Sequence, residues 1–155
     1  MNKATDPVAL LESALIDALG AECLLGDDAK TLFSTDVYGG AIAPTLVVRP
    51  QTQEHVADAV RIATTAGWAI TQRGGGMSYT GGYLPTQANT VMLDLSALNG
   101  IVSINEDDLV ITVEAGVTWQ QIWEALTPRG LRLPFFGTFS GSRATVGGGL
   151  SNGAL

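Results

Sequence analysis

The sequence contains only one cysteine and one histidine, Cys23 and His55. A single cysteine excludes an internal disulfide and a zinc site built on several thiolates, so we expect no bound metal. With one histidine, serine–histidine–aspartate and cysteine–histidine catalysis are excluded unless His55 itself takes part. A lone thiol is typical of a reducing compartment, and we expect the protein to be cytoplasmic.

Charge is also scarce, and most of it is acidic. Charged residues make up 15% and hydrophobic residues 46% of the 155 residues, and the formal net charge is −7. The sequence has no basic patch, so we do not expect nucleic acid as a partner. No apolar run reaches the roughly 18 residues of a transmembrane segment. The length suffices for one domain, and the apolar composition indicates surface that further protein normally covers.

Glycine, in contrast, is concentrated between Gln72 and Gly82, in the run QRGGGMSYTGG. Glycine tolerates positive φ and lets a ligand approach the backbone, and free N–H groups in such a loop can converge on an anion. Arg73 would add a forked cationic donor, and Ser78 and Thr80 would add hydroxyl donors. The run therefore predicts a diphosphate-binding loop, although a tight turn without a ligand has a similar composition.

Two well-known phosphate motifs do not fit this loop. Gly76 and Gly81 have the spacing of a Walker loop, but Gly82 and Tyr83 stand where lysine and a hydroxyl residue are required. A dinucleotide-binding fingerprint would need a third glycine at the position of Tyr79. The sequence therefore supports neither an ATPase nor an ordinary NAD-binding fold.

The first half of the chain predicts a helix, an irregular stretch and a βαβ unit. Asp6 and Pro7 begin a helix that ends near Gly20, and residues 21–42 are expected to be irregular, with turns at 27–28 and 39–40. A strand over 45–48, a helix capped by Thr52 and a strand over 68–71 then lead into the glycine loop. The buried stripe expected on that second helix is Val56, Ala59, Val60 and Ala63.

The second half predicts a further strand, a hairpin and a helix. The strand covers residues 91–95, and the hairpin joins 101–105 to 109–115 around an acidic turn. Thr118 and Gln121 form a capping-box pattern for a helix that runs to about Thr127. The side chains expected on one buried face of this helix are Trp119, Ile122, Trp123 and Leu126.

A second glycine-rich stretch runs from residue 133 to residue 149 and includes Ala144-Thr145-Val146-Gly147-Gly148. Such small residues allow a cofactor to touch the backbone, but they equally allow a helix to pack closely on a sheet. Composition alone leaves both interpretations open.

Together the two loops resemble FAD-linked oxidases of the vanillyl-alcohol oxidase type, whose cofactor domain is called the PCMH-type FAD-binding fold. The pattern R-G-G-G-x-S-x-x-G-G, followed by Leu84 and Pro85, resembles the family's pyrophosphate loop, and residues 144–148 resemble its second FAD-contacting segment. The resemblance covers about Leu46 to Leu155. It implies an α+β fold in which two small α/β subdomains sandwich FAD.

The resemblance also implies a division of the chain. Residues 1–44 would form an N-terminal helix and leader, and residues 45–155 would form the PCMH-type FAD-binding domain. Within it, 45–99 would be the first subdomain with the pyrophosphate loop, and 100–155 an incomplete part of the second. The twelve residues after Arg143 are uncharged, which is unusual for an exposed end, so we expect a truncated protein or a fragment.

The resemblance assigns FAD as the cofactor but assigns no catalytic residue and no metal ligand. The residues that it implies in FAD binding are Arg73, Gly74, Gly75, Gly76, Met77, Ser78, Gly81, Gly82, Pro134, Gly137, Thr138, Ser142, Ala144, Thr145, Gly147 and Gly148. Many family members with a histidyl-linked flavin carry the histidine in or beside the first loop. Met77 follows the third glycine here, which implies FAD that is bound non-covalently.

The implied function is the FAD-binding portion of a flavin-dependent oxidoreductase that oxidises an alcohol or a 2-hydroxy acid. Its partners would be the small-molecule substrate, an electron acceptor, and the rest of the polypeptide or a second subunit that carries the substrate domain. The alternative is a non-catalytic nucleotide-binding or interaction module that keeps the fold without redox turnover.

Overall fold

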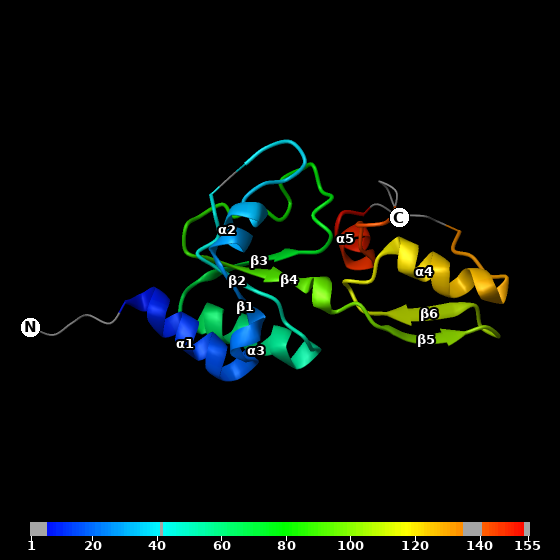
Figure 1. The fold of residues 1–155 in the computed structure, drawn as a ribbon, viewed down its shortest axis with the longest axis horizontal. Coiled ribbons are helices and arrows are strands. Elements are labelled where there is room, and N and C mark those ends of the chain that lie inside the picture. Colours follow the sequence, from blue (N-terminus) through cyan, green and yellow to red (C-terminus); the bar gives the residue numbers. More distant parts are fainter. Residues whose placement is uncertain (1–5, 41, 135–140, 154–155) are drawn as a thin grey trace, which may run out of the picture.

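The computed structural model describes residues 6–40, 42–134 and 141–153. The first half of the chain forms a four-stranded sheet with helices on both faces (Figure 1). The strand order is β1 (Leu24–Leu25), β2 (Leu46–Val48), β4 (Thr90–Asp94) and β3 (Ala69–Arg73). The last three strands run parallel, whereas β1 pairs antiparallel with β2.

Alternating side chains of the central strands build two hydrophobic layers, as the period of a strand requires. On one face, Leu46 and Val48 of β2 and Val91 and Leu93 of β4 pack against α1 (Pro7–Leu19) and α3 (Gln53–Thr65). On the other face, Val47 and Met92 pack against Phe33 of α2 (Asp27–Phe33) and against Tyr83. All five residues of β4 are buried, as expected for a strand with parallel neighbours on both sides.

The predicted βαβ unit is present as β2, α3 and β3, although β4 is inserted between its two strands. Asp6 caps α1 by accepting from the Val8 N–H, and Thr52 caps α3 by accepting from the His55 N–H, as the sequence predicts. The helices end near glycines of positive φ, Gly20 and Gly67.

The elements of the second half of the described chain lie to one side of the four-stranded sheet (Figure 1). They have a hydrophobic core of their own. A hairpin of β5 (Ile101–Asn105) and β6 (Val110–Val113) packs against α4 (Trp119–Leu126), whose predicted capping box is complete. The short helix α5 (Val146–Ser151) follows the second glycine-rich stretch. Three 3₁₀ turns complete the described elements: η1 (Ala21–Cys23), η2 (Leu95–Ala97) and η3 (Thr127–Arg129).

Three local expectations are wrong. Residues 21–42 are not irregular throughout, because Asp27 and Asp28 occupy the first turn of α2, where acidic side chains interact favourably with the helix dipole. On α3, Val60 is 36% exposed, and on α4, Trp123 is 53% exposed. The buried face of each of these helices is therefore narrower than the sequence predicts. The buried side chains of α3 are Ala59 and Ala63, and those of α4 are Trp119, Ile122 and Leu126.

None of the helices in the described ranges is long and apolar enough to cross a membrane.

Candidate cofactor-binding site

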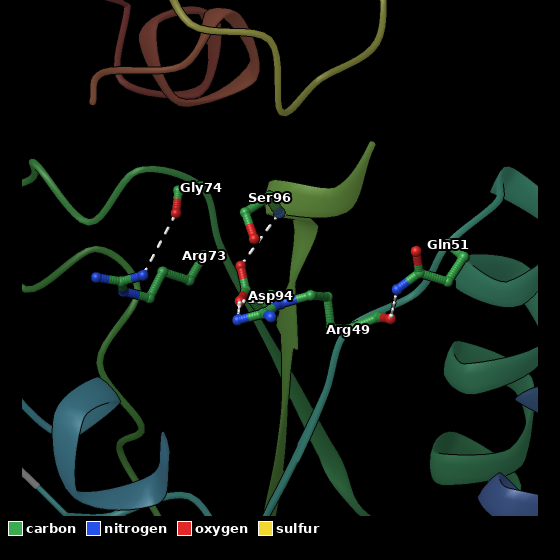
Figure 2. A network of polar contacts seen from close by, with 6 residues as sticks. All are labelled: Arg49, Gln51, Arg73, Gly74, Asp94 and Ser96. Atoms are coloured by element: carbon green, nitrogen blue, oxygen red, sulfur yellow. Dashed lines mark hydrogen bonds and ion pairs between the residues drawn. The ribbon is translucent and has the colours of Figure 1, made fainter. Parts of the chain in front are cut away.

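The carboxyl ends of the three parallel strands meet at one edge of the sheet, which is the usual place for ligands in such sheets. Asp94, at the end of β4, accepts from Nε and Nη2 of Arg49 at 2.8 Å each, and its other oxygen accepts from the Ser96 N–H at 3.1 Å (Figure 2). The Asp94 side chain is only 2% exposed. This ion pair ties the ends of β2 and β4 together beside the start of the glycine loop.

A cavity of about 550 Å³ lies between the glycine loop and the second half of the chain, and we call it the glycine-loop cavity. One wall is the loop itself, from Gly74 to Tyr83, and the facing wall consists of Trp119, Ala144, Thr145 and α5. The volume falls within the range of about 300–1,000 Å³ that is typical of cofactor sites.

The loop wall offers free hydrogen-bond donors. Within the described ranges, the main-chain N–H groups of Gly75, Met77 and Ser78 donate to no protein acceptor, and all three residues line the cavity. The hydroxyls of Ser78 and Thr80 lie 3.1 Å apart on the same wall. Neighbouring free amides in a loop can make an anion-binding surface that needs no charged side chain.

The facing wall differs from the loop wall, because main-chain N–H groups there already donate hydrogen bonds within the protein. The Gly147 N–H donates to the Ala115 carbonyl at 2.9 Å, and the Gly148 N–H donates to the Thr145 hydroxyl at 3.3 Å. A Cβ on Gly147 would lie 2.9 Å from the Ala115 Cβ, and one on Gly149 would lie 3.0 Å from the Trp119 ring. These glycines therefore pack α5 closely on the hairpin unit and leave a smooth wall of small residues toward the cavity.

Gly74 and Gly75 make a second close contact between the two halves. A Cβ on Gly75 would overlap the Arg143 carbonyl, and a Cβ on Gly74 would overlap the Thr145 hydroxyl. Gly76 and Gly81 have another requirement, because both adopt φ of +69°. Glycine is thus required at the start of the loop because of the close contact with the second half, and at Gly76 and Gly81 because of the positive φ.

A family model described as an FAD binding domain matches residues 44–155. The chain belongs to this FAD-binding family. It is 32% identical over 126 residues to the mitochondrial D-lactate dehydrogenase [cytochrome] 1 of Saccharomyces cerevisiae, covering 80% of this chain and 21% of that protein.

Solved structures agree with this assignment. The 4-ethylphenol oxidase from Gulosibacter chungangensis is 26% identical with a TM-score of 0.80, over 96% of this chain and 29% of that one. A p-cresol methylhydroxylase, 24% identical with a TM-score of 0.76, shows the same fold over 90% of this chain and 28% of that one. The predicted PCMH-type fold and the predicted cofactor, FAD, are thereby confirmed. The chain spans less than a third of the length of these proteins.

The FAD-binding domain brings most of the sequence-predicted site residues to one cavity. Those that line the glycine-loop cavity are Gly74, Gly75, Met77, Ser78, Gly82, Ala144, Thr145, Gly147 and Gly148. Gly76 and Gly81 shape the loop without lining the cavity. Pro134 is exposed and lines neither of the two large cavities, and Gly137 and Thr138 lie outside the described residues.

Arg73 and Ser142 line a second cavity instead, also of about 550 Å³, beyond the contact of Gly75 with Arg143. The Arg73 guanidinium stacks on the Phe33 ring at 4.2 Å from its centroid and lies 5.4 Å from the centroid of Tyr83. Its Nε is buried without a hydrogen-bond partner among the described residues. Its Nη1 donates to the Gly74 carbonyl at 3.5 Å (Figure 2). This arrangement gives no support to a contact between Arg73 and a diphosphate.

The sequence-based prediction missed other parts of the cavity wall. The additional lining residues are Gln72, Tyr79, Tyr83, Leu95, Ala115, Trp119, Gly149, Ser151 and Asn152. Trp119 was expected only in the core, and it is only 5% exposed, yet its ring forms part of the wall. Thr80 lines the cavity too and was expected there as a hydroxyl donor, and Tyr79 could have been found because it lies inside the glycine loop. Leu95 and Ala115 carry no signal in the sequence.

The ionisable groups of the FAD-binding domain lie mostly away from this wall. The described lining contains no Asp, Glu, His or Lys. Tyr83 does line it, and burial raises the pKa of its phenol while the nearby Arg73 charge lowers it in part. His55 lies in the first turn of α3, 3.7 Å from Cys23 Sγ, and burial raises the pKa of that thiol. No group of three or more potential metal-binding side chains occurs in the part of the chain that the structure describes.

Proposed function

We propose that the glycine-loop cavity holds FAD non-covalently and that the chain is the cofactor part of a flavoprotein oxidoreductase acting on an alcohol or a 2-hydroxy acid. The observation that carries this proposal is that Gly75, Met77 and Ser78, whose amides donate to no acceptor among the described residues, line a cavity of cofactor size. The diphosphate is the part of FAD that such a surface fits.

The two walls have different roles in this proposal. The loop amides and the hydroxyls of Ser78 and Thr80 bind the diphosphate. The facing wall, where Trp119, Gly147 and Gly148 expose little more than backbone and ring surface, allows the flat parts of the cofactor to lie close. Bound FAD supplies the two-electron acceptor, while the protein supplies binding and orientation.

The positions of the histidine and the cysteine support non-covalent attachment. His55 and Cys23 are the chain's only histidine and cysteine, and neither lines the cavity. Met77 occupies the loop position at which the resemblance would place a linking histidine.

The groups that bind the substrate and take its proton lie outside the described cavity. We assign an alcohol or 2-hydroxy acid because a relative is named as a D-lactate dehydrogenase and a structural neighbour as a 4-ethylphenol oxidase. General base catalysis needs a group within hydrogen-bond reach of the substrate, and no described Asp, Glu, His or Lys meets this condition at the cavity. The base therefore comes from the remainder of the polypeptide or from a second subunit, and a separate electron acceptor reoxidises the flavin.

The division into residues 1–44, 45–99 and 100–155 remains part of the proposal. The separate hydrophobic cores support the boundary near residue 100, whereas α1 shares one core with β2 and β4. We also propose a cytoplasmic location, which rests on the single unpaired cysteine.

The experiment that tests this function is a titration of the purified protein with FAD and with riboflavin, followed by flavin fluorescence. Riboflavin lacks the diphosphate, so the loop should favour FAD strongly. Ser78→Ala should weaken FAD binding about tenfold, as expected for a lost hydrogen bond to a charged group. Ser103→Ala, on the exposed side of β5, is the matched control and should leave affinity unchanged. Equal affinity for riboflavin and FAD would contradict the diphosphate role.

A further inference from the structure

The leader between α2 and β2 contacts the glycine loop directly, although it precedes the region that matches the family model. Figure 1 shows this segment passing beside the loop that follows β3. Within the leader, the Asp36 N–H donates to the Gly39 carbonyl at 2.8 Å, and Thr35 pairs with Gly40. The leader is therefore a closed turn that presents the Asp36 side chain to the loop.

Asp36 joins this turn to the loop through its two carboxylate oxygens. Oδ1 accepts from the N–H groups of Tyr38 at 2.8 Å and Gly39 at 2.9 Å. Oδ2 accepts from the N–H of Gly81 at 3.0 Å, 45 positions further along the chain. Hydrogen bonds from backbone amides to an ionised carboxylate are stronger than those between neutral groups.

A second connection lies at the other end of the same stretch of loop. The Tyr83 hydroxyl is 3.2 Å from the carbonyl oxygens of both Thr35 and Gly76, so it can donate to either one. Tyr83 itself is only 6% exposed. The rings of Tyr38 and Tyr79 also meet edge to face, with centroids 6.0 Å apart.

The two connections flank the residues that would bind the cofactor. Gly76 and Gly81 are the loop's positive-φ glycines, and Met77, Ser78, Tyr79 and Thr80 between them all line the cavity. Fixing both ends of so short a segment lowers the entropy that the loop must lose when a ligand binds.

We propose that the leader segment 34–40 holds the glycine loop in its ligand-binding shape, with Asp36 as a positioning residue for the cofactor site. The proposal rests on the proposed function for its effect on FAD, whereas its effect on the loop can be measured without FAD. Asp36 does not line the cavity, so it acts through the loop rather than on the cofactor.

The variant Asp36→Asn separates the two tasks of this side chain. Asparagine keeps one oxygen that can close the leader turn, but its amide nitrogen cannot accept from the Gly81 N–H. Hydrogen exchange of the FAD-free protein should become faster at residues 76–82 and remain similar at 34–40. The dissociation constant for FAD should rise about tenfold, as for loss of a hydrogen bond to a charged group. The circular dichroism of the bound flavin should change as well, because the loop orients the cofactor.

Two further variants control the result. Asp107→Ala removes the same charge from the hairpin turn, far from the loop in the sequence, and should change neither exchange at 76–82 nor FAD affinity. Tyr83→Phe removes only the hydroxyl, keeps the buried ring, and should speed exchange around Gly76 even if the Asp36 variant failed to fold. Unchanged exchange at 76–82, or unchanged FAD affinity, in a folded Asp36→Asn or Tyr83→Phe variant would overturn the proposal. If the parent protein bound no FAD, the proposed function would be wrong, and the exchange measurements would still decide whether the leader holds the loop.

Discussion

Gly75 is the residue at which the two halves of the chain come closest in the described structure of the loop. Its α-carbon faces the Arg143 carbonyl so closely that no side chain fits between them. The contact between Gly75 and the Arg143 carbonyl therefore requires a glycine at this position, whether or not FAD also approaches its N–H.

Gly75→Ala should destabilise the protein by about 1–3 kcal/mol, the usual cost of forcing extra atoms into a packed site. Because the contact sets the width of the glycine-loop cavity, FAD affinity should also fall at least tenfold, or about 1.4 kcal/mol. Thermal unfolding and an FAD titration measure the two effects. Gly26→Ala is the control, since a Cβ there meets nothing within 4 Å, and a Gly75 variant that matched it in both assays would refute the close contact.

The pH dependence of stability should report the ionisation of Asp36. Hydrogen bonds from the N–H groups of Tyr38 and then Gly39 lower the pKa of this carboxyl below its ordinary value of 3.8. A lowered native pKa means that its contribution is complete above the unfolded value and is lost as the pH falls through the native value. Tyr83, whose hydroxyl lies 3.2 Å from the Thr35 carbonyl beside Asp36, stays neutral throughout this range because burial raises its pKa above 10.

The difference in unfolding midpoint between the parent and Asp36→Asn should therefore be constant above about pH 5 and should shrink as the pH falls below 3.8. Thermal unfolding at several pH values between 6 and 3 measures it. A difference that did not vary over this range would show that the ionised carboxylate contributes no stability beyond what asparagine provides.

At the residue scale, the sequence predicts that the glycine loop forms the candidate site, but it does not predict where each side chain of the loop lies. Met77 and Ser78 line the cavity as expected, because a glycine-rich run after a strand exposes its backbone. Arg73 does not, because two aromatic rings from distant positions, Phe33 and Tyr83, provide a stacking surface that attracts the guanidinium. Such long-range partners cannot be inferred from the local pattern.

At the scale of elements, the ion pair of Arg49 with Asp94 connects the end of β2 to the end of β4 beneath the glycine loop. Asp94 is almost completely buried and also fixes the turn after β4 through the Ser96 N–H. The pair of Arg61 with Asp58 has the same 2.8 Å separation on the surface of α3, but there the Asp58 side chain is 41% exposed.

Asp94→Ala should lower the free energy of unfolding by roughly 2–4 kcal/mol, less than for a fully buried pair because Arg49 can turn toward solvent. Asp58→Ala should cost less than about 1 kcal/mol, since exposed ion pairs contribute little. Denaturant unfolding of the two variants gives the comparison. Similar losses in both would mean that burial does not set the strength of the Asp94 pair.

Most elements follow from the sequence because their signals are local. Caps at Asp6, Thr52 and Thr118 and the alternation of apolar residues each act within one turn or one strand. The helix α2 was missed because two adjacent aspartates favour a turn as readily as a helix start, and the choice depends on the packing of Phe33 under β2 and β4. The position of β4 between β2 and β3 also depends on tertiary contacts that no local pattern encodes.

For the whole molecule, the central feature is a cavity between two units with separate cores, one built on the four-stranded sheet and one on the hairpin. Each unit contributes one glycine-rich wall. The described wall carries hydrogen-bond donors and apolar surface but no Asp, Glu, His or Lys that could take a proton from a substrate.

The 155-residue chain with FAD bound should therefore fail to oxidise alcohols or 2-hydroxy acids. The assay is a panel of such substrates with an artificial electron acceptor, with a complete flavoprotein oxidase as positive control. Exposed apolar residues should also cause the isolated chain to associate, which sedimentation measures. Turnover by a monomeric chain on the order of 1 per second or faster would show that the catalytic base lies within it.

The most direct test of the account is whether the purified chain binds FAD and releases it intact. The protein is loaded with FAD, freed of excess cofactor, and its visible spectrum is recorded before and after acid denaturation and separation of the polypeptide. We predict a yellow protein with a perturbed flavin spectrum, and all of the flavin in the soluble fraction after denaturation. A colourless protein would contradict FAD binding in the glycine-loop cavity, and flavin that stayed with the polypeptide would contradict non-covalent attachment.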